Sequence, residues 1–507
     1  MQASKQNTGL IVLSMALGLL MSSLDNTIVS ACISDVIKDI GGFDKMTWIF
    51  TAYMLAATST MLIFGKMSDL FGRKLFYLIG IGLFLLGSAL CGMAQTVDQL
   101  IWFRVIQGIG SGALFPISFT IIYTVFGDPK QAAKLSGVFG AIFGLSSVAG
   151  PQLGTFIAEH WSWRWCFYVN VPIGIASFLI LLFALKESRS EAKPKIDYLG
   201  TVLLIASTVS LMLALEWGGK EYAWSSWQIL TLFTVAGVSG VLFIPVERRA
   251  KEPVLPLHLF KNRMVAGTSI VCFCQGAIMF SAVTYLPIFS VAVLQQANSN
   301  SVLTPMMASV IAGAMGFGFL QTKFAFRTLM LFSMAMGVLV SILLATVGVD
   351  AGKGYMILLM IILGFGAVGP MMSVAQNAVA ANVEAKYMGI SSSVVGFWRS
   401  IGGVLGASIM ATIVNNDLKQ RITDEAAKQQ IPAEQIDKMA NPELLMRAGD
   451  SIPPQMHDFL RDALGTAINH GFILCICVAG VGIVTAMFVG PGRLDMTKKQ
   501  EGVGHAA

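Results

Sequence analysis

Long apolar runs recur along the whole chain, and they constrain its fold more than any other feature. About 18 to 20 consecutive apolar residues are enough for a helix to cross the hydrocarbon core of a bilayer. Only 12% of the 507 residues are charged, whereas soluble proteins average about 25%. We therefore expect an all-α integral membrane protein. The fourteen candidate spans are 10–33, 47–65, 76–94, 100–123, 135–158, 165–185, 199–218, 229–246, 264–288, 302–321, 328–347, 354–380, 390–414 and 465–489.

The distribution of Lys and Arg predicts the orientation. An even number of spans puts both termini on one side, and positive charge concentrates on the cytoplasmic side of membrane proteins. If the N-terminus is inside, the short outside loops hold few basic residues, namely Lys38, Lys45, Arg164, Lys220 and Lys353. The first run is too long for a signal-peptide core and lacks a convincing cleavage site, so we interpret it as an uncleaved span. Both termini are expected to be cytoplasmic.

Several classes of function find no support in the sequence. The net charge of +6 reflects topology, and no basic stretch carries the interleaved aromatic residues of a nucleic-acid site. No phosphate-binding G-x-x-x-x-G-K-[ST] loop is present. The pairs Cys272/Cys274 and Cys475/Cys477 point about 200° apart on a helix, so neither pair can close on one metal ion. The few histidines suggest no catalytic constellation. We expect no enzymatic activity, no metal and no cofactor, and see no sign of an obligatory protein partner.

Two halves of the chain are weakly similar. The segments "KLSGVFGAIFGLSSVAGPQLGTFI" (134–157) and "YMGISSSVVGFWRSIGGVLGASIM" (387–410) both follow a short basic loop and alternate small residues through a span. Internal repeats of this kind are typical of secondary transporters, whose substrate site lies between the repeats near the bilayer midplane. We expect a six-helix bundle (1–186), linkers with a two-helix insert (187–263), a second six-helix bundle (264–490) and a cytoplasmic tail (491–507).

The polar segment 415–464 lies between the last two spans. Its apolar residues recur at helical spacing, and we interpret it as a short helical hairpin outside the membrane. An inert excursion and a lid both remain open.

The stretch "GKMSDLFGRK" (65–74) joins the second and third spans on the predicted inner side. Gly65 and Gly72 permit a tight turn with closely packed helices. Asp69, Arg73 and Lys74 can pair with one another and with the end of a neighbouring helix.

This loop resembles the signature loop of the major facilitator superfamily, where it latches the two halves in the outward-facing state. The stretches "LDNTIV" (24–29), "RVIQGIGSG" (104–112), "GPQLG" (150–154), "WSWRWCFYVNVPIG" (161–174) and "LALEWGG" (213–219) resemble its fourteen-span drug:proton antiporter family.

The resemblance implies a major facilitator fold of six, two and six spans in a bacterial-type cytoplasmic membrane. It also implies export of amphipathic small molecules in exchange for entering protons. A dedicated exporter of one lipid, peptide or siderophore-type metabolite remains the alternative, and a membrane sensor that transports nothing is a more distant one.

Asp25 and Arg104 are charged residues inside predicted spans. They lie roughly 12 Å and 6 Å below the outer boundary, so they can pair if spans 1 and 4 are neighbours. Burial favours the protonated form of a carboxyl group and a nearby arginine favours the charged form, so a small rearrangement can load or release a proton. A static ion pair is the alternative, and Asp25 can also read the charge of a substrate. The resemblance favours a proton site, with Arg104 as a relay.

Gly150, Pro151 and Gly154 in span 5 allow close helix packing and a kink. The resemblance associates this motif with exporters, although a generic kinked membrane helix would look similar. Glu216 lies near the outer end of span 7, where we expect either an interfacial position or a cation-attracting mouth.

Arg399 lies deep in span 13, and no acidic residue occupies the middle of the last six spans. It must therefore meet backbone carbonyls, water or an acid of the first half, and a role in gating or substrate charge selection is open. Methionines are suited to an adaptable apolar cavity. The candidates for such a lining are Met306, Met307, Met371 and Met372.

Overall fold

The protein is described by a computed structural model, and its described residues are almost entirely helical. These are residues 7–42, 45–126, 129–186, 195–219, 221–296, 300–429 and 454–493. Fourteen helical segments within them are long and apolar enough to cross a membrane. The all-α architecture with fourteen spans is thereby confirmed.

Residues 8–184 form helices α1 to α7, which we name the N-terminal unit. Their bounds are α1 Thr8–Ile40, α2 Met46–Phe71, α3 Arg73–Met93, α4 Val97–Val125, α5 Pro129–His160, α6 Trp165–Tyr168 and α7 Asn170–Ala184. Helix α4 begins where Thr96 accepts a hydrogen bond from the Gln99 backbone N–H (3.2 Å), as expected of an N-cap threonine. Helices α2 and α3 are separated only by Gly72, whose φ of 113° favours glycine.

Two helices follow as an insert, and the remaining helices form the C-terminal unit. The insert comprises α8 Tyr198–Trp217 and α9 Trp227–Arg249. The C-terminal unit comprises α10 Arg263–Ile288, α11 Asn300–Leu320, α12 Phe326–Ala345, α13 Lys353–Ile362, α14 Gly369–Ala380, α15 Met388–Gln429 and α18 Pro454–Phe488. Short π-helical segments at Phe289–Val293 and Leu363–Val368 continue α10 and join α13 to α14.

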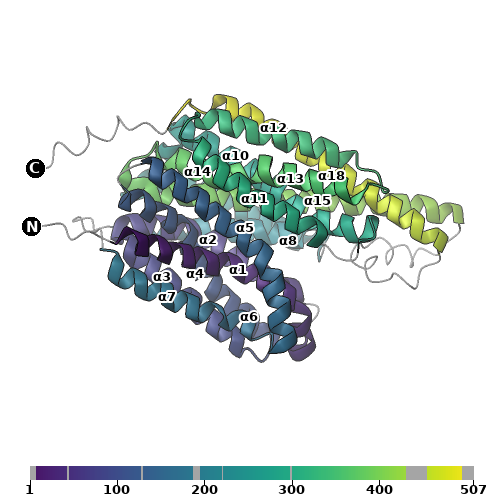
Figure 1. The fold of residues 1–507 in the computed structure, drawn as a ribbon, viewed down its shortest axis with the longest axis horizontal. Helices are drawn as coiled ribbons and strands as arrows, with labels where there is room; N and C mark the ends of the chain where they lie inside the picture. Colours follow the sequence, from purple (N-terminus) through teal and green to yellow (C-terminus); the bar gives the residue numbers. More distant parts are fainter. Residues whose placement is uncertain are drawn as a thin grey trace, which may run out of the picture.

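The two units lie side by side, and the start of α1 and the end of α18 lie at the same end of the molecule (Figure 1). We name this the terminal end. The insert packs against both units, since Trp217 of α8 contacts Trp48 of α2 with ring centroids 5.4 Å apart. The Ser408 hydroxyl of α15 also donates to the Leu215 carbonyl of α8 (2.8 Å).

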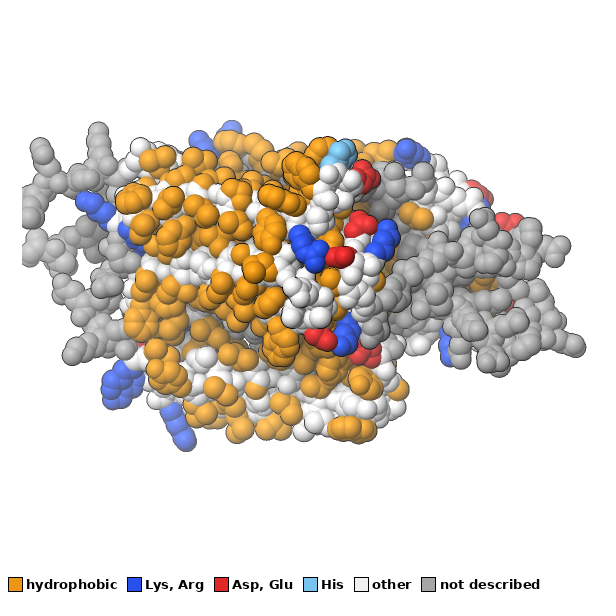
Figure 2. Space-filling view, turned by 90° about the horizontal axis from the view of Figure 1, so that it is seen from below, with side chains coloured by type: hydrophobic (Ala, Val, Ile, Leu, Met, Phe, Trp, Pro, Cys, Tyr) orange, Lys and Arg blue, Asp and Glu red, His pale blue; other side chains and the backbone are white. Residues whose placement is uncertain are grey.

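Hydrophobic side chains cover the middle of the face drawn in Figure 2, and charged side chains gather towards its two ends. Large exposed apolar residues such as Trp102, Phe183 and Val241 occur on the spanning helices. An exposed apolar belt of this kind is what a bilayer requires of the surface that it contacts.

Helices α5 and α11 bring the two units together near the terminal end. A Cβ atom added to Gly318 of α11 would lie 2.9 Å from the Cα of Gly137 in α5. Beside this contact, the Gln321 amide donates to the Ala133 carbonyl (3.1 Å). The Asn377 amide of α14 donates to the Ser136 hydroxyl (2.5 Å). Small residues therefore permit the two units to meet backbone to backbone at this end.

The described parts of the expected hairpin at 415–464 are helical and continue the flanking spans. Helix α15 runs without a break to Gln429, and α18 begins at Pro454. Both helices project beyond the rest of the bundle, away from the termini (Figure 1). Leu418 and Ile422 of α15 are buried in the same cluster as Leu460 and Leu464 of α18, so these parts of the two helices share one hydrophobic core. The remainder, 430–453, lies outside the described residues.

The close approach of α5 and α11 gives a test of the unit interface. Gly318→Ala should lower the stability of the purified protein by about 1 to 3 kcal/mol, because the new methyl group overpacks a backbone contact. Gly316→Ala, on the same helix, meets nothing within 4 Å and should be neutral or slightly stabilising. Thermal unfolding in detergent measures both, and equal melting temperatures for the two variants would contradict the packing described.

Candidate functional site

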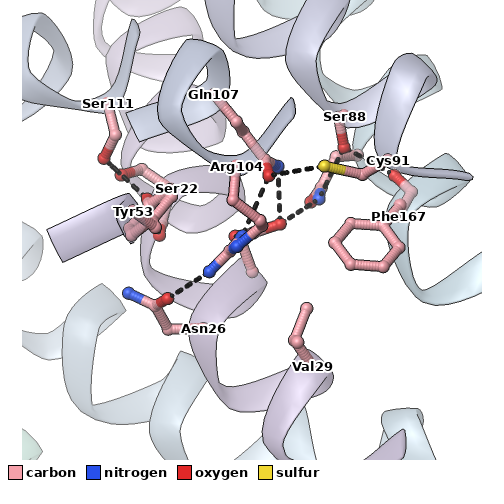
Figure 3. Close-up of polar contacts among 12 residues, drawn as sticks. Ser22, Asn26, Val29, Tyr53, Ser88, Cys91, Arg104, Gln107, Ser111 and Phe167 are labelled. Carbon is pink, nitrogen blue, oxygen red and sulfur yellow. Dashed lines mark hydrogen bonds and ion pairs between the residues drawn. The ribbon is translucent and has the colours of Figure 1, made fainter. Parts of the chain in front are cut away.

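Asp25 of α1 and Arg104 of α4 form an ion pair inside the N-terminal unit, and each is 0% exposed. The Arg104 Nη1 group donates to Asp25 Oδ2. The geometric expectation that the two residues pair is therefore met, because α1 and α4 are neighbours. Gln107 and Asn26 both point towards the guanidinium group of Arg104 (Figure 3).

Asp25 has two further partners. Its Oδ1 atom accepts hydrogen bonds from the amides of Gln107 (2.7 Å) and Asn170 (2.9 Å). Asn170 is the first residue of α7 and also donates to the Ser88 hydroxyl of α3 (3.2 Å). The carboxylate is thus held by side chains from two helices besides its own.

Arg104 is satisfied by acceptors that do not depend on Asp25. Its Nε atom donates to the Ile49 carbonyl of α2 (3.0 Å), its Nη1 to Gln107 Oε1 (2.9 Å) and its Nη2 to Asn26 Oδ1 (2.8 Å). Its guanidinium carbon lies 4.1 Å from the centre of the Tyr53 ring. Neutralising Asp25 would remove the charge that opposes Arg104 and leave its guanidinium with three neutral oxygen acceptors.

The sequence pointed to Asp25 and Arg104 but not to the groups around them. The sequence could have predicted that Gln107 contacts this pair, because it lies three residues after Arg104 and so on the same face of α4. Asn26 adjoins Asp25 in "LDNTIV". Asn170 lies in the quoted stretch 161–174, but nothing in the sequence pairs it or Tyr53 with this site, because their contacts are set by how α7 and α2 turn towards α1.

The loop 65–74 holds a second set of charged residues, and it connects the two units. The Asp69 carboxylate accepts from the backbone N–H groups of Gly389 and Ile390 (both 2.9 Å), which lie at the start of α15. Negative charge at a helix N-terminus is favourable, because unpaired N–H groups and the helix dipole both point there. Arg73 donates to the Ala385 carbonyl (2.8 Å) and lies 3.6 Å from Asp69.

Three further residues of the stretch 65–74 contact other parts of the chain. A Cβ atom on Gly65 would lie 2.8 Å from the Gly389 carbonyl oxygen, so glycine permits the close contact. Lys74 donates to the Leu182 carbonyl at the end of α7 (2.7 Å), within the N-terminal unit. Lys66, which was not singled out, is buried and pairs with Glu252 of the linker before α10 (3.0 Å).

Gly150, Pro151 and Gly154 lie on α5 against α1. A Cβ atom on Gly150 would lie 2.6 Å from the Cβ of Thr27, and one on Gly154 would lie 2.6 Å from the Ile28 carbonyl oxygen. Both contacts lie within one turn of Asp25. Helix α5 continues through Pro151 to His160.

The other candidates lie apart from the Asp25 network. Glu216 is half-buried near the end of α8. Arg399 is half-buried in α15; its Nη1 donates to the Met372 sulfur (3.3 Å), and its guanidinium carbon lies 4.9 Å from the Phe115 ring centre. We expected carbonyls, water or an acid, but the contacts found among described residues are a thioether and an aromatic ring.

The four methionine candidates are buried. They are Met306, Met307, Met371 and Met372. Met307 and Met372 border the N-terminal unit, since Cβ atoms on Gly144 and Gly140 of α5 would lie 3.1 Å and 3.2 Å from them. No group of His, Cys, Asp and Glu that could hold a metal ion occurs within the described part of the chain.

Comparisons with known proteins all point to membrane transporters. The sequence pattern of the "Major Facilitator Superfamily" matches residues 15–407. Multidrug resistance protein 3 of Bacillus subtilis (strain 168) is 40% identical over 507 residues, covering 98% of this chain and 99% of that protein. Multidrug transporter protein MdtP of the same organism is 34% identical over 518 residues, covering 97% and 95%.

Solved structures resemble the fold at low sequence identity. The human organic anion transporter MFSD10 (TETRAN) superposes with a TM-score of 0.61 at 12% identity, covering 93% of this chain and 99% of that one. A bacterial homologue of the human lysosomal transporter Spinster gives a TM-score of 0.56 at 14% identity, covering 96% and 98%. With its fourteen spanning helices and a family match over most of its length, the chain belongs to the Major Facilitator Superfamily as a multi-pass membrane protein.

Proposed function

We propose that this protein is a proton-coupled exporter of amphipathic small molecules in a bacterial-type cell membrane, with both termini in the cytoplasm. The observation that carries the proposal is the buried Asp25–Arg104 pair, in which Arg104 keeps oxygen acceptors of its own. The names of the two Bacillus subtilis relatives, a multidrug resistance protein and a multidrug transporter, support this class of substrate.

The chemistry of the pair supports proton coupling. A charged carboxylate in a buried site is stable only with compensation, and Arg104 supplies it. A proton that enters and binds Asp25 removes the need for that compensation, while Gln107, Asn26 and Ile49 continue to hold the guanidinium. Asp25 is the protonated group in this proposal and Arg104 is the relay that shifts between its acceptors.

The loop 65–74 acts as the conformational latch in the same proposal. Asp69 and Arg73 bind the segment leading into α15 at the terminal end, where α5 and α11 also meet. With the termini inside, these contacts close the cytoplasmic side. Export requires that they break and re-form in each cycle, so their strength sets the balance between the two conformations.

Replacing Asp25 tests the proton site directly. In proteoliposomes, Asp25→Asn should abolish the substrate-induced collapse of a pH gradient and reduce efflux of a lipophilic cation by about a hundredfold, since the amide cannot take up a proton. Asp35→Asn is the matched control, because Asp35 lies on the same helix but is exposed and pairs with Lys38.

Wild-type cation efflux and gradient collapse in Asp25→Asn would refute the assignment. Loss of cation efflux with neutral-drug efflux retained would show instead that Asp25 reads substrate charge. Failure of the wild type to move any member of a panel of lipophilic cations, neutral drugs and anions would favour the dedicated metabolite exporter.

Removing Asp69 tests the latch. Asp69→Ala deletes two charge-assisted hydrogen bonds to α15, each of which is worth about 1.5 to 3 kcal/mol, so the closed form at the terminal end is weakened. We expect the maximal efflux rate to fall about tenfold while equilibrium affinity for substrate changes less than about twofold. Asp98→Ala removes an exposed acid that pairs with Lys45 and should transport normally. Equal efflux rates for both variants would rule out the latch role.

A further inference from the structure

Arg399 is a charged side chain placed where charge is costly. It lies eleven residues after Met388, the first residue of α15, which corresponds to about 16 Å along the helix axis. This puts it close to the middle of a span, where an arginine is expensive unless it meets a partner or water. The residue is mostly but not fully buried.

The partners of Arg399 leave most of its hydrogen-bonding capacity unused. A guanidinium group has five N–H donors, and the bond to the Met372 sulfur is one contact with a weak acceptor. Phe115 contributes the face of its ring, which attracts a cation but accepts no strong hydrogen bond. No carboxylate of the described residues forms an ion pair with Arg399.

Arg104 makes the contrast clear. It is fully buried and has carboxylate, amide and carbonyl oxygens as acceptors. Phe115 lies on the same helix as Arg104 but eleven residues further along α4, so about 16 Å separates the two arginine sites along the axis. Arg399 is therefore distinct from the proton site.

Arg399 lies between the two units. Phe115 belongs to the N-terminal unit and Met372 to the C-terminal unit. Met372 also approaches Gly140 of α5. A ligand that reaches the exposed part of Arg399 would thus contact both units, whose relative movement transports it.

We propose that Arg399 binds the carboxylate of an amphipathic substrate, and that the Phe115 ring packs against the apolar body of the same molecule. The guanidinium fork matches a carboxylate with two parallel hydrogen bonds. The depth of Arg399 places it well below the level of lipid headgroups. The proposal rests on the export function proposed above and extends its substrates to organic anions.

Equilibrium binding with three matched probes tests this site. The probes are tritiated 2-naphthylacetate, 2-naphthylethanol and 2-naphthylmethyl-trimethylammonium, which share one aromatic ring and differ in charge. Scintillation proximity on the purified full-length protein measures each affinity without a proton gradient. The wild type should bind the carboxylate more tightly than the alcohol.

Arg399→Gln should weaken carboxylate binding by about tenfold or more, as expected for loss of a charged hydrogen-bonding partner. The alcohol and ammonium probes should lose much less affinity. Arg399→Lys keeps the charge without the planar fork and should fall between wild type and Arg399→Gln. Phe115→Ala should weaken all three probes. Arg421→Gln, on the same helix but paired with Asp417 (3.0 Å), is the control and should bind like the wild type.

Two results for Arg399→Gln would overturn the proposal. One is an unchanged affinity for the carboxylate probe, and the other is an equal loss of affinity for all three probes. If that variant does not fold, the ranking of the probes on the wild type decides, and a carboxylate bound no more tightly than the alcohol refutes the site. Because the assay uses no gradient, a failed proton assignment at Asp25 would leave its outcome unaffected.

Discussion

Taking an ionised side chain out of water costs several kcal/mol, and the cost is offset only when an opposite charge and hydrogen bonds surround it. The Asp25–Arg104 pair meets this requirement with groups from α1, α2, α4 and α7. The packing of these four helices is therefore tied to one pair of charges. Any change in the charge of Asp25 alters the electrostatic balance at the centre of the N-terminal unit.

Helix α5 connects this pair to the rest of the molecule. Gly150 and Gly154 allow one part of α5 to pack closely against α1 beside Asp25. Gly137 allows an earlier part of α5 to contact Gly318 of α11. One helix thus contacts both the charged pair and the interface between the units. Helix α5 can therefore couple the charge of Asp25 to the contact between the units. Such coupling requires that a change in the charge of Asp25 alters the preferred arrangement of the two units.

The latch adds a second constraint of a different kind. Asp69 is held by backbone N–H groups at the start of α15, so its contact requires the units to be close at the terminal end. The Asp25 contacts, by comparison, lie within one unit and do not require closure. A cycle can therefore change the charge of Asp25 and the state of the latch in separate steps.

The sequence predicted what depends on position along a helix. Fourteen apolar runs gave the spans, and the rise per residue placed Asp25 and Arg104 at depths that allow pairing. It did not predict contacts that depend on how helices rotate or which unit they face, such as those of Asn170, Tyr53 and Phe115. The sequence predicts helix within 415–464. It does not predict that α15 continues unbroken to Gln429 or that Leu418 and Leu460 share a buried cluster, because burial depends on how the two helices pack.

The central claim is that Asp25 exchanges its proton as substrate binds, and proton release from the purified protein tests it most directly. Adding a lipophilic cation to the detergent-solubilised protein in weakly buffered solution should release protons that a pH indicator detects. The account predicts release from the wild type and from Asp35→Asn, and none from Asp25→Asn. Equal release from Asp25→Asn and the wild type would contradict it.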